Sequence, residues 1–587
     1  MYDILNKINS PEDVKKLSVI ELKELARDIR EALFNRLTKI GGHCAPNFGA
    51  VEAEIAMHYV FSSPKDKFVF DVSHQSYPHK MLTGRKAGYI DASRFFEDSG
   101  YTNPEESVHD LFNVGHTSTS ISLATGLAKA REIRGGTEKI VAFIGDGSLS
   151  GGEALEGLNM AGSEIHSNLI IIVNDNQQSI SETHGGIYRN LKELRESGGR
   201  AENNMFTAWG LKYLYVPDGN DIVSLIDAFT EAKNADRPIV VHINTLKGKG
   251  FALAEKNKEA WHWTLPFDRQ TGEITVPSAK TTYVQIAREY ILNRAKTDET
   301  FVAVTPNMPG SFSLSKADRE SMGEKFVDVG IAEEQAAAMA AGLAKGGAKP
   351  LVFTNVTFMQ RAYDQISQDV CINGAHVTFL LNCAAFDSLT DVTHLGIFGL
   401  SIFSNIPSLT VLTPASKSEL AGMLDWALDK NDGASVILMP GGEVTARPQS
   451  GFDGSFRYKT EQKGERLAIL ALGDFYKRGE EIAGRVKDKF GFTPTLIAPG
   501  FASSLDEKTL NHLKNNHELT ITLEDGVVDG GFGQKIAAFY GDSEMKVKNY
   551  GLKKKFYDRY SPEELLRTLG MDTESVLKDI QRLLRLD

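Results

Sequence analysis

Two short polar turns carry the residue types that hold a metal-bound anion. Gly145-Asp146-Gly147 follows the apolar run KIVAFI (139–144), and Asn174-Asp175-Asn176 follows NLIIIV (168–173). Because adjacent parallel strands end at the same edge of a sheet, we expect both turns at one place. Carboxylate, amide and main-chain oxygens suit Mg²⁺, and glycines let backbone N–H groups approach an anion. The alternative is an ordinary strand-to-helix turn with an aspartate cap.

The elements that must position these turns form three series of apolar runs alternating with helical patterns. Such alternation predicts an α/β fold with mainly parallel sheets flanked by helices. The predicted strands are 67–72, 139–144, 168–173, 211–216 and 238–243, then 301–305, 350–356, 376–382, 409–414 and 435–440, then 467–472, 494–499 and 519–525. Polar linkers at 267–282 and 448–466 separate the series. We therefore predict three domains, residues 1–270, 280–445 and 455–587.

Composition excludes several classes of protein. The 587 residues carry a net charge of −12, which argues against a nucleic-acid or anionic-membrane partner. The three cysteines are widely spaced, so neither a disulfide framework nor a structural metal site is indicated, and a reducing cytoplasm fits best. The N-terminal 30 residues have the spacing of an amphipathic helix, and no signal or membrane-spanning segment is evident.

The two turns, with the segments around them, resemble a known enzyme family. GDG followed thirty residues later by NDN is similar to the thiamine-diphosphate motif. Further matching segments follow in family order: GGHCAPNFGAVEAEIAMHYVF, FDVSHQSYPHKMLTGR, NVGHTSTSISLATGLAKA, VGIAEEQAAAMAAGLAKGGAKP and FMQRAYDQISQDV. Together they resemble the 1-deoxy-D-xylulose-5-phosphate synthase family of the transketolase superfamily over nearly the whole chain. The resemblance implies a diphosphate-binding domain, a pyrimidine-binding domain and a C-terminal transketolase-like domain, in that order.

The resemblance also implies a cofactor site. Asp146, Asn176 and the main-chain carbonyl of Gln178 would hold Mg²⁺, which bridges to the cofactor diphosphate. His74, Gly115, His116, Thr117, Gly147, Ser148, Phe251, Glu333 and Phe358 would contact thiamine diphosphate. Phe251 replaces the family's usual tyrosine and follows the glycine-rich run KGKG (247–250), whose alternative is a solvated loop.

Glu333 is the expected catalytic acid. It lies in the first turn of a predicted Ala-rich helix, Ala332 to Lys345, where the helix dipole favours a carboxylate. The alternative is therefore a surface glutamate. By resemblance Glu333 bonds the aminopyrimidine ring and promotes the tautomer that deprotonates the thiazolium carbon. Phe358 would stack on the pyrimidine, or alternatively is a plain core residue.

Five of the fourteen histidines fall in these family motifs. Imidazoles of near-neutral pKa donate hydrogen bonds to substrate oxygens and shuttle protons. By resemblance His43, His262 and His394 face the reacting carbons and are catalytic. A single histidine in a turn is more often structural than catalytic. This prediction therefore rests on the five motif histidines taken together.

The substrate end departs from the family pattern. Family members carry two arginines that serve the phosphate of the acceptor, glyceraldehyde 3-phosphate; here Cys383 and Gly441 fall at those places. Asn355 replaces a phosphate-contacting tyrosine, and Thr390 an aspartate. Losing two charge-assisted bonds of about 1.5 to 3 kcal/mol each weakens phosphate binding by about two to four powers of ten. Arg361 or Lys256 are candidates for compensation.

The resemblance implies that pyruvate is decarboxylated and its two-carbon unit joined to an aldehyde, for isoprenoid biosynthesis. A variant with another acceptor, a transketolase-like ketol transferase with another 2-oxo donor and acceptor, and a non-catalytic cofactor-binding paralogue are the alternatives. We expect small-molecule substrates, no nucleic acid, no membrane, and a cytoplasmic homodimer.

Overall fold

The computed structural model describes residues 2–277, 281–444 and 451–586. The chain divides into two compact units, each described by itself below. The first comprises Met1–Ser278 with Gly330–Ala332, and the second Ala279–Val329 with Glu333–Asp587.

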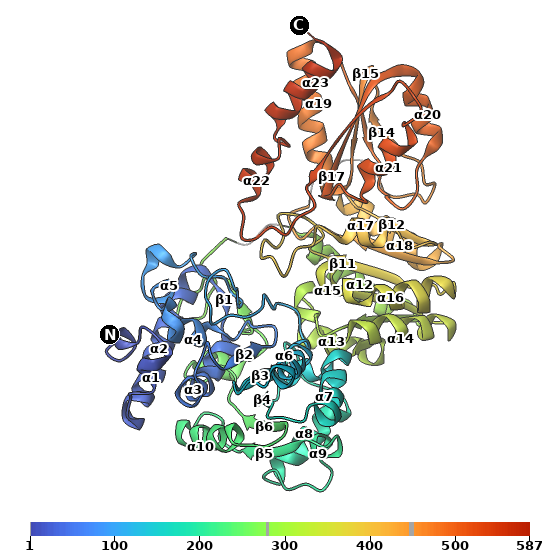
Figure 1. Cartoon of the computed structure of the whole chain (residues 1–587). Coiled ribbons are helices and arrows are strands. Elements are labelled where there is room, and N and C mark those ends of the chain that lie inside the picture. The colour runs from blue at the N-terminus through green and yellow to red at the C-terminus, as the bar shows by residue number, and fades with distance from the viewer. Residues whose placement is uncertain (1, 278–280, 445–450, 587) are drawn as a thin grey trace. The chain divides into compact units, whose positions relative to one another are not determined.

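The first unit is built on a five-stranded parallel sheet in the order β2-β3-β4-β6-β5, flanked by helices (Figure 1). Its strands are β2 (Lys67–Phe70), β3 (Ile140–Gly145), β4 (Ile170–Asp175), β5 (Lys212–Val216) and β6 (Ile239–Asn244). Its helices are α1 (Pro11–Val14), α2 (Val19–Ile40), α3 (Ala45–Val60), α4 (Tyr77–Lys80), α5 (Ala87–Ile90), α6 (Ser120–Arg134), α7 (Gly152–Glu164), α8 (Gly186–Glu196), α9 (Met205–Ala208), α10 (Ile222–Lys233) and α11 (Ala252–Lys256). A small antiparallel pair joins β1 (Gly42–His43) to β7 (Trp263–Thr264).

The apolar runs form strands because both faces of this sheet are buried. Along β3, Ile140, Ala142 and Ile144 pack into one core cluster, whereas Val141 and Phe143 pack into another. Successive side chains of a strand point to opposite faces, so a strand covered on both faces is apolar throughout. The polar residues that follow β3 and β4 are thereby placed at the sheet edge.

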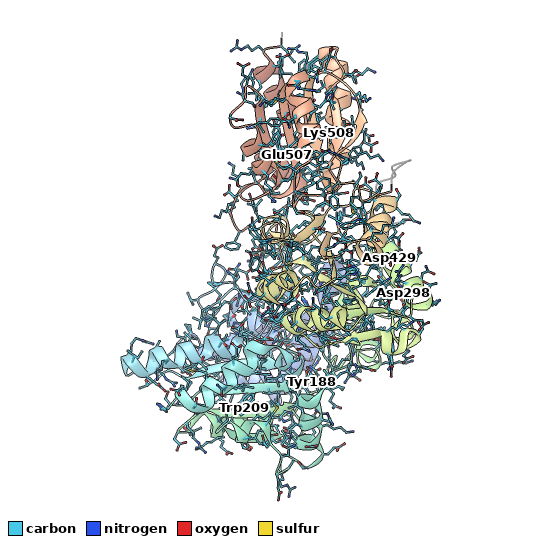
Figure 2. The ribbon with its side chains drawn as sticks, turned by 90° about the vertical axis from the view of Figure 1, so that its right-hand side faces the viewer. Tyr188, Trp209, Asp298, Asp429, Glu507 and Lys508 are labelled. Atoms are coloured by element: carbon cyan, nitrogen blue, oxygen red, sulfur yellow. The ribbon has the colours of Figure 1, made fainter. Side chains whose placement is uncertain are left out.

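The second unit holds a six-stranded parallel sheet in the order β12-β13-β11-β10-β8-β9. Its strands are β8 (Phe301–Thr305), β9 (Phe326–Asp328), β10 (Lys349–Asn355), β11 (Thr378–Asn382), β12 (Leu409–Leu412) and β13 (Ala434–Leu438). Its helices are α12 (Tyr283–Thr297), α13 (Lys316–Met322), α14 (Glu333–Lys345), α15 (Val356–Met359), α16 (Tyr363–Gln365), α17 (Gly399–Phe403) and α18 (Lys417–Asp429). Asp298 and Asp429, labelled in Figure 2, both bind the Lys349 ammonium, at 3.3 and 2.7 Å, and so tie α12 and α18 to β10.

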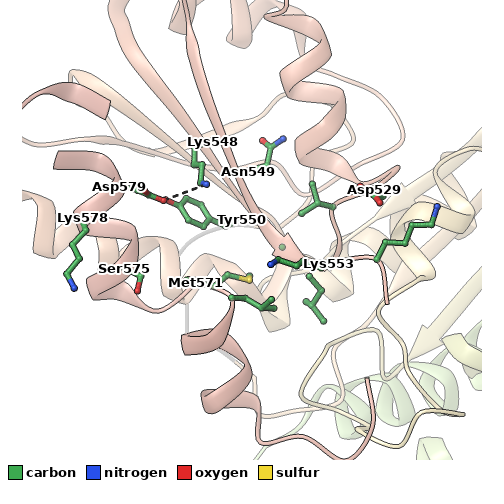
Figure 3. Close-up of a pocket in the computed structure, with 15 residues that line it drawn as sticks. Asp529, Lys548, Asn549, Tyr550, Lys553, Met571, Ser575, Lys578 and Asp579 are labelled. Carbon is green, nitrogen blue, oxygen red and sulfur yellow. Dashed lines mark hydrogen bonds and ion pairs between the residues drawn. The ribbon is translucent and has the colours of Figure 1, made fainter. Parts of the chain in front are cut away.

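A second sheet in this unit has the order β14-β16-β15-β17-β18, with β14 alone antiparallel. Its strands are β14 (Lys459–Gln462), β15 (Arg466–Ala471), β16 (Thr495–Ala498), β17 (His517–Val527) and β18 (Lys546–Leu552). Its helices are α19 (Tyr476–Phe490), α20 (Glu507–Asn516), α21 (Phe532–Phe539), α22 (Pro562–Thr568) and α23 (Thr573–Leu584). A cavity of about 760 Å³ lies between β18 and α23 (Figure 3); its lining residues fall within 528–579 and include none of the predicted site residues.

The α/β class, the three sheets and their mainly parallel character confirm the sequence prediction. Five strands lie outside the predicted runs: β9, β14, β18 and the two strands of the short β1–β7 pair. The domain limits stay a prediction, and those near 280 and 445 fall on residues outside the described ranges. None of the helices in the described ranges combines the length and apolar composition that a membrane span requires.

Candidate active site

The GDG and NDN turns lie at the same edge of the first sheet. β3 and β4 are adjacent and parallel, and Gly145 is in register with Asn174. The turn after β3 touches the segment after β4, because a β-carbon at Gly147 would lie 2.4 Å from Ser179 Oγ. Tyr188 of α8, labelled in Figure 2, donates its hydroxyl to the Gly147 carbonyl at 3.2 Å. A larger residue at position 147 would therefore displace Ser179.

The predicted magnesium ligands present buried oxygens that the protein leaves unsatisfied. Asp146 Oδ2 and Asn176 Oδ1 have no hydrogen-bond partner within the described part of the chain, and the two residues are 2% and 9% exposed. Burial raises the pKa of Asp146 to about 7, and the charge of Asp175 adds to the rise. A cation relieves both effects, so this oxygen-only set fits Mg²⁺. Clusters of three or more His, Cys, Asp or Glu side chains able to hold a metal are absent from the described ranges.

Asp175, between the two asparagines of the NDN turn, is already paired within the protein. Its buried carboxylate pairs with Arg195 of α8 and accepts a hydrogen bond from His242 Nε2 at 2.9 Å. His242 Nδ1 then accepts from the Tyr213 hydroxyl at 2.8 Å. Burial acts to raise the pKa of Asp175, but His242 and Arg195 hold it below its usual value. This chain of contacts holds the NDN turn in place. Its members are too far apart in the sequence to be recognised as a motif.

Three histidines of the first unit gather beside this edge of the sheet. The ring centroids of His43, His74 and His262 lie 4.9 Å (43–74), 5.2 Å (74–262) and 5.8 Å (43–262) apart. Burial, with the charge of Lys247, lowers the pKa of His74 to about 3 and holds that of His262 well below its usual value. Both imidazoles are therefore neutral at pH 7, when they can accept as well as donate a hydrogen bond.

Lys247 is a site residue that the sequence prediction missed. It is 2% exposed, so the alternative of a solvated loop is wrong at this position. Its ammonium lies 3.1 Å from His262 Nδ1 and donates to the Ser179 carbonyl. Burial lowers its pKa to about 7, although Asp146 opposes that shift. The sequence feature that could have identified Lys247 is its position between the end of an apolar strand and a glycine turn.

The predicted cofactor loop at Gly115-His116-Thr117 is held from its C-terminal side. Ser118 has a left-handed φ of 75° and donates its N–H to Asp71 Oδ1 at 2.8 Å. Its hydroxyl donates to the Ser148 carbonyl at 2.8 Å. The loop is thus fastened to the GDG turn, as a shared cofactor contact requires.

Phe251 packs in the core of the first unit. It is 5% exposed and contacts the rings of Phe34, Phe48, Trp261 and Phe267, with centroids 4.7 to 6.1 Å away. This packing accounts for its burial without a ligand. Its contact with a cofactor stays a prediction.

Glu333 begins α14 in the second unit, one residue later than predicted, and is 2% exposed. The alternative of a surface glutamate is therefore wrong. Burial raises its pKa to about 7, although the Arg361 guanidinium, 3.5 Å from Oε2, opposes the rise. Glu333 is thus a carboxyl group that takes up or releases a proton near neutral pH.

Phe358 and His394 lie together in the second unit. Phe358, in α15 after β10, is half-buried, and its ring meets that of His394 edge to face at 5.4 Å. The His394 ring is oriented by Thr393 Oγ1, 2.8 Å from Nδ1. A half-buried aromatic beside an oriented imidazole is compatible with the predicted stacking role, which stays a prediction.

The departures from the family pattern also gather in the second unit. Asn355 ends β10 and Cys383 follows β11, its neighbour. The N–H of Gly441 donates to Ser388 Oγ at 3.3 Å. Arg361, one candidate for replacing the missing arginines, pairs instead with Glu333.

Family models match consecutive parts of this chain. The family model for 1-deoxy-D-xylulose-5-phosphate synthase matches residues 5–202, that for the transketolase pyrimidine-binding domain 279–445, and that for the transketolase C-terminal domain 457–576. Among solved structures, transketolase from Leishmania mexicana matches 97% of this chain and 98% of its own at 16% identity, with a TM-score of 0.45.

Curated relatives match over the full length. The 1-deoxy-D-xylulose-5-phosphate synthase of Alkaliphilus oremlandii is 36% identical, with 99% of each chain covered. That of Clostridium kluyveri is 35% identical over 100% of this chain and 99% of its own, and synthase 1 of Geobacter sulfurreducens is 36% identical over 98% and 96%. The chain therefore belongs to the 1-deoxy-D-xylulose-5-phosphate synthase family of transketolase-type transferases.

Proposed function

We propose that this chain decarboxylates pyruvate and joins the remaining two carbons to the carbonyl carbon of an aldehyde, giving a 1-deoxyketose. The observation that carries the proposal is the buried carboxyl of Glu333, whose pKa of about 7 fits proton exchange with a cofactor ring at neutral pH. When bound, thiamine diphosphate supplies the carbon that stabilises the electron pair left after loss of CO₂. This activity belongs to isoprenoid biosynthesis.

The protein's own groups have separate roles in this proposal. Glu333 holds the aminopyrimidine through its carboxyl group, and Phe358 packs against the same ring. His43, His262 and His394 donate hydrogen bonds to substrate oxygens and move protons at them. Neutral imidazoles suit this role because each nitrogen is either a donor or an acceptor.

Mg²⁺ binds Asp146, Asn176 and the Gln178 carbonyl in this proposal. The unsatisfied buried oxygens of the first two residues support it. Gly147, Ser148, His74 and the loop Gly115-His116-Thr117 contact the diphosphate or the ring next to it. Lys247, when protonated, places a positive charge close enough to interact with Asp146.

A homodimer and a cytoplasmic location complete the proposal. The three cysteines, Cys44, Cys371 and Cys383, are free thiols, as a reducing compartment requires. The dimer is carried over from the family resemblance. Light scattering that gives a mass near 64.4 kDa, the mass of one chain, contradicts the dimer.

The test is CO₂ release from pyruvate in the presence of Mg²⁺ and thiamine diphosphate. We expect Glu333→Ala to lower the rate at least a hundredfold, and the adjacent Glu334→Ala to stay within threefold of wild type. Equal rates for wild type and Glu333→Ala favour the non-catalytic paralogue. Turnover with hydroxypyruvate or a ketose phosphate, but not pyruvate, favours the ketol transferase.

A further inference from the structure

Two asparagines stand side by side at the carboxyl ends of β10 and β11. Asn355 is in register with Asn382, and the residues are 6% and 4% exposed. The Oδ1 atom of each is buried without a hydrogen-bond partner in the described part of the chain. Asn382 Nδ2 donates to the Ser311 carbonyl at 3.3 Å. This hydrogen bond identifies Oδ1 as the end of the Asn382 amide that is left as an acceptor. A buried acceptor without a donor is costly, so a ligand with hydroxyl groups fits this pair.

Three small, uncharged residues, Cys383, Ser388 and Gly441, form the wall beside these amides. Cys383 follows Asn382 directly and has a left-handed φ of 56°. A β-carbon at Gly441 would lie 3.0 Å from Ser388 Oγ and 3.5 Å from Cys383 Sγ. Cys383, Ser388 and Gly441 are thus immediate neighbours, and two of them stand where the family carries its phosphate-binding arginines.

Carboxylates surround the same loop. The Phe386 N–H donates to Asp525 Oδ1 at 2.8 Å, which brings the loop against the end of β17. Burial holds the pKa of Asp525 well above its usual value, with Asp387 and Asp474 adding to the rise and Arg478 opposing it. Burial and Asp387 raise the pKa of Asp474 to about 6, against the charge of Lys477. The groups that face this loop are thus mainly carboxyls, which offer no positive charge to a phosphate.

We propose that Asn355 and Asn382 bind the hydroxyl groups of an uncharged hydroxyaldehyde acceptor, in place of the phosphate of glyceraldehyde 3-phosphate. The inference rests on the proposed function, since it names the acceptor of that reaction. The aldehyde carbon forms the new carbon–carbon bond and its oxygen takes up a proton, so the hydroxyl groups held by the two amides are unchanged.

The test compares D-glyceraldehyde with D-glyceraldehyde 3-phosphate as acceptors for wild-type enzyme with pyruvate, Mg²⁺ and thiamine diphosphate, each product being identified by NMR. We expect kcat/KM to be at least tenfold higher for D-glyceraldehyde. Equal values, or a preference for the phosphorylated acceptor, overturn the inference and leave the proposed function standing. Absence of CO₂ release from pyruvate under every condition overturns the proposed function first.

Variants separate recognition from general damage. Asn382→Leu and Asn355→Leu should each lower kcat/KM for D-glyceraldehyde about tenfold, whereas the exposed Asn405→Leu should leave it within twofold. Cys383→Arg should shift the ratio of the two kcat/KM values at least tenfold toward the phosphorylated acceptor, relative to the uncharged comparator Cys383→Ser. A ratio that is the same in Cys383→Arg and Cys383→Ser contradicts the assignment of this wall. If circular dichroism shows that Cys383→Arg does not fold, the ratio of the two kcat/KM values in the wild-type enzyme decides whether the inference stands.

Discussion

The guanidinium of Arg361 lies 3.5 Å from Oε2 of Glu333, the carboxyl group that begins α14. Glu333 Oε2 nevertheless makes no hydrogen bond in the described part of the chain. Arg361 therefore supplies charge near the carboxylate while leaving this oxygen available to a ligand. Burial still outweighs that charge, and the carboxyl holds its proton near neutral pH.

The first prediction concerns stability and pH. The pKa of Glu333 is about 7 in the folded chain, against 4.5 for an ordinary glutamate in the unfolded chain, so the folded state binds this proton more tightly. Stability from this group is present below pH 4.5 and is lost as the pH rises through about 7. We expect Glu333→Gln to gain about 3 kcal/mol of unfolding free energy over wild type between these limits, since one pKa unit is worth about 1.4 kcal/mol. Urea unfolding at pH 5 and pH 8 measures the difference, with Glu334→Gln as the control; a pH-independent difference contradicts the prediction.

The second prediction concerns Arg361. Arg361→Met removes the charge that opposes the upward shift of the Glu333 pKa, so the pKa should rise further. CO₂ release at pH 7 should fall about tenfold, and the loss should shrink at higher pH as the carboxyl ionises. Arg361→Lys keeps the charge and should recover most of the rate. The exposed Arg582→Met is the control, and a loss of equal size at every pH indicates a merely structural role.

The third prediction concerns cofactor binding without turnover. Asp146→Ala and Asn176→Ala remove the two unsatisfied oxygens, and each should weaken binding of Mg²⁺ with thiamine diphosphate at least tenfold by calorimetry. The exposed Asp236→Ala should bind as wild type does. Chelation of the metal should also lower Tm, since a ligand at 100 times its Kd stabilises by about 2.7 kcal/mol. Unchanged affinity in both variants refutes the assigned ligand set.

The fourth prediction concerns the loop that carries Cys383 and His394. A β-carbon at Gly396 would lie 1.9 Å from the Cys383 carbonyl oxygen, so Gly396→Ala must displace one backbone segment. We expect a loss of about 1 to 3 kcal/mol in unfolding free energy, as for other overpacked sites. Gly442→Ala is the matched control, because nothing lies within 4 Å of its β-carbon position. Equal Tm values for the two variants contradict the close contact.

The apolar strands were predictable from sequence, and the polar edge strands β14 and β18 were not. β3 and β4 are apolar throughout because helices cover both faces, so composition alone distinguishes them. β14, with the residues KTEQ, and β18, with KVKNYGL, stand at the two edges of their sheet and are largely polar. An edge strand exposes much of its surface, so its residues carry no continuous apolar signal.

The candidate site likewise contains residues that the sequence predicted and residues that it did not. The motif spacing predicted that Asp146 and Asn176 meet, because two adjacent strands of equal register end there. Lys247 and the chain from Asp175 through His242 to Tyr213 were not predicted as site residues, since their roles arise from burial and from contacts between distant segments. The sequence alone likewise left Glu333 as either a surface or a buried group.

By itself, the amino-acid sequence determined the α/β class, the order of the sheets, the family and the residue types available for chemistry, because these depend on local periodicity and on motifs of fixed spacing. Tertiary structure decided which of those groups are buried, and so which have shifted pKa values. It also decided that Asn355 and Asn382 stand together with unsatisfied oxygens. Burial and unsatisfied hydrogen bonding are properties of packed surroundings, which no single segment of the chain contains.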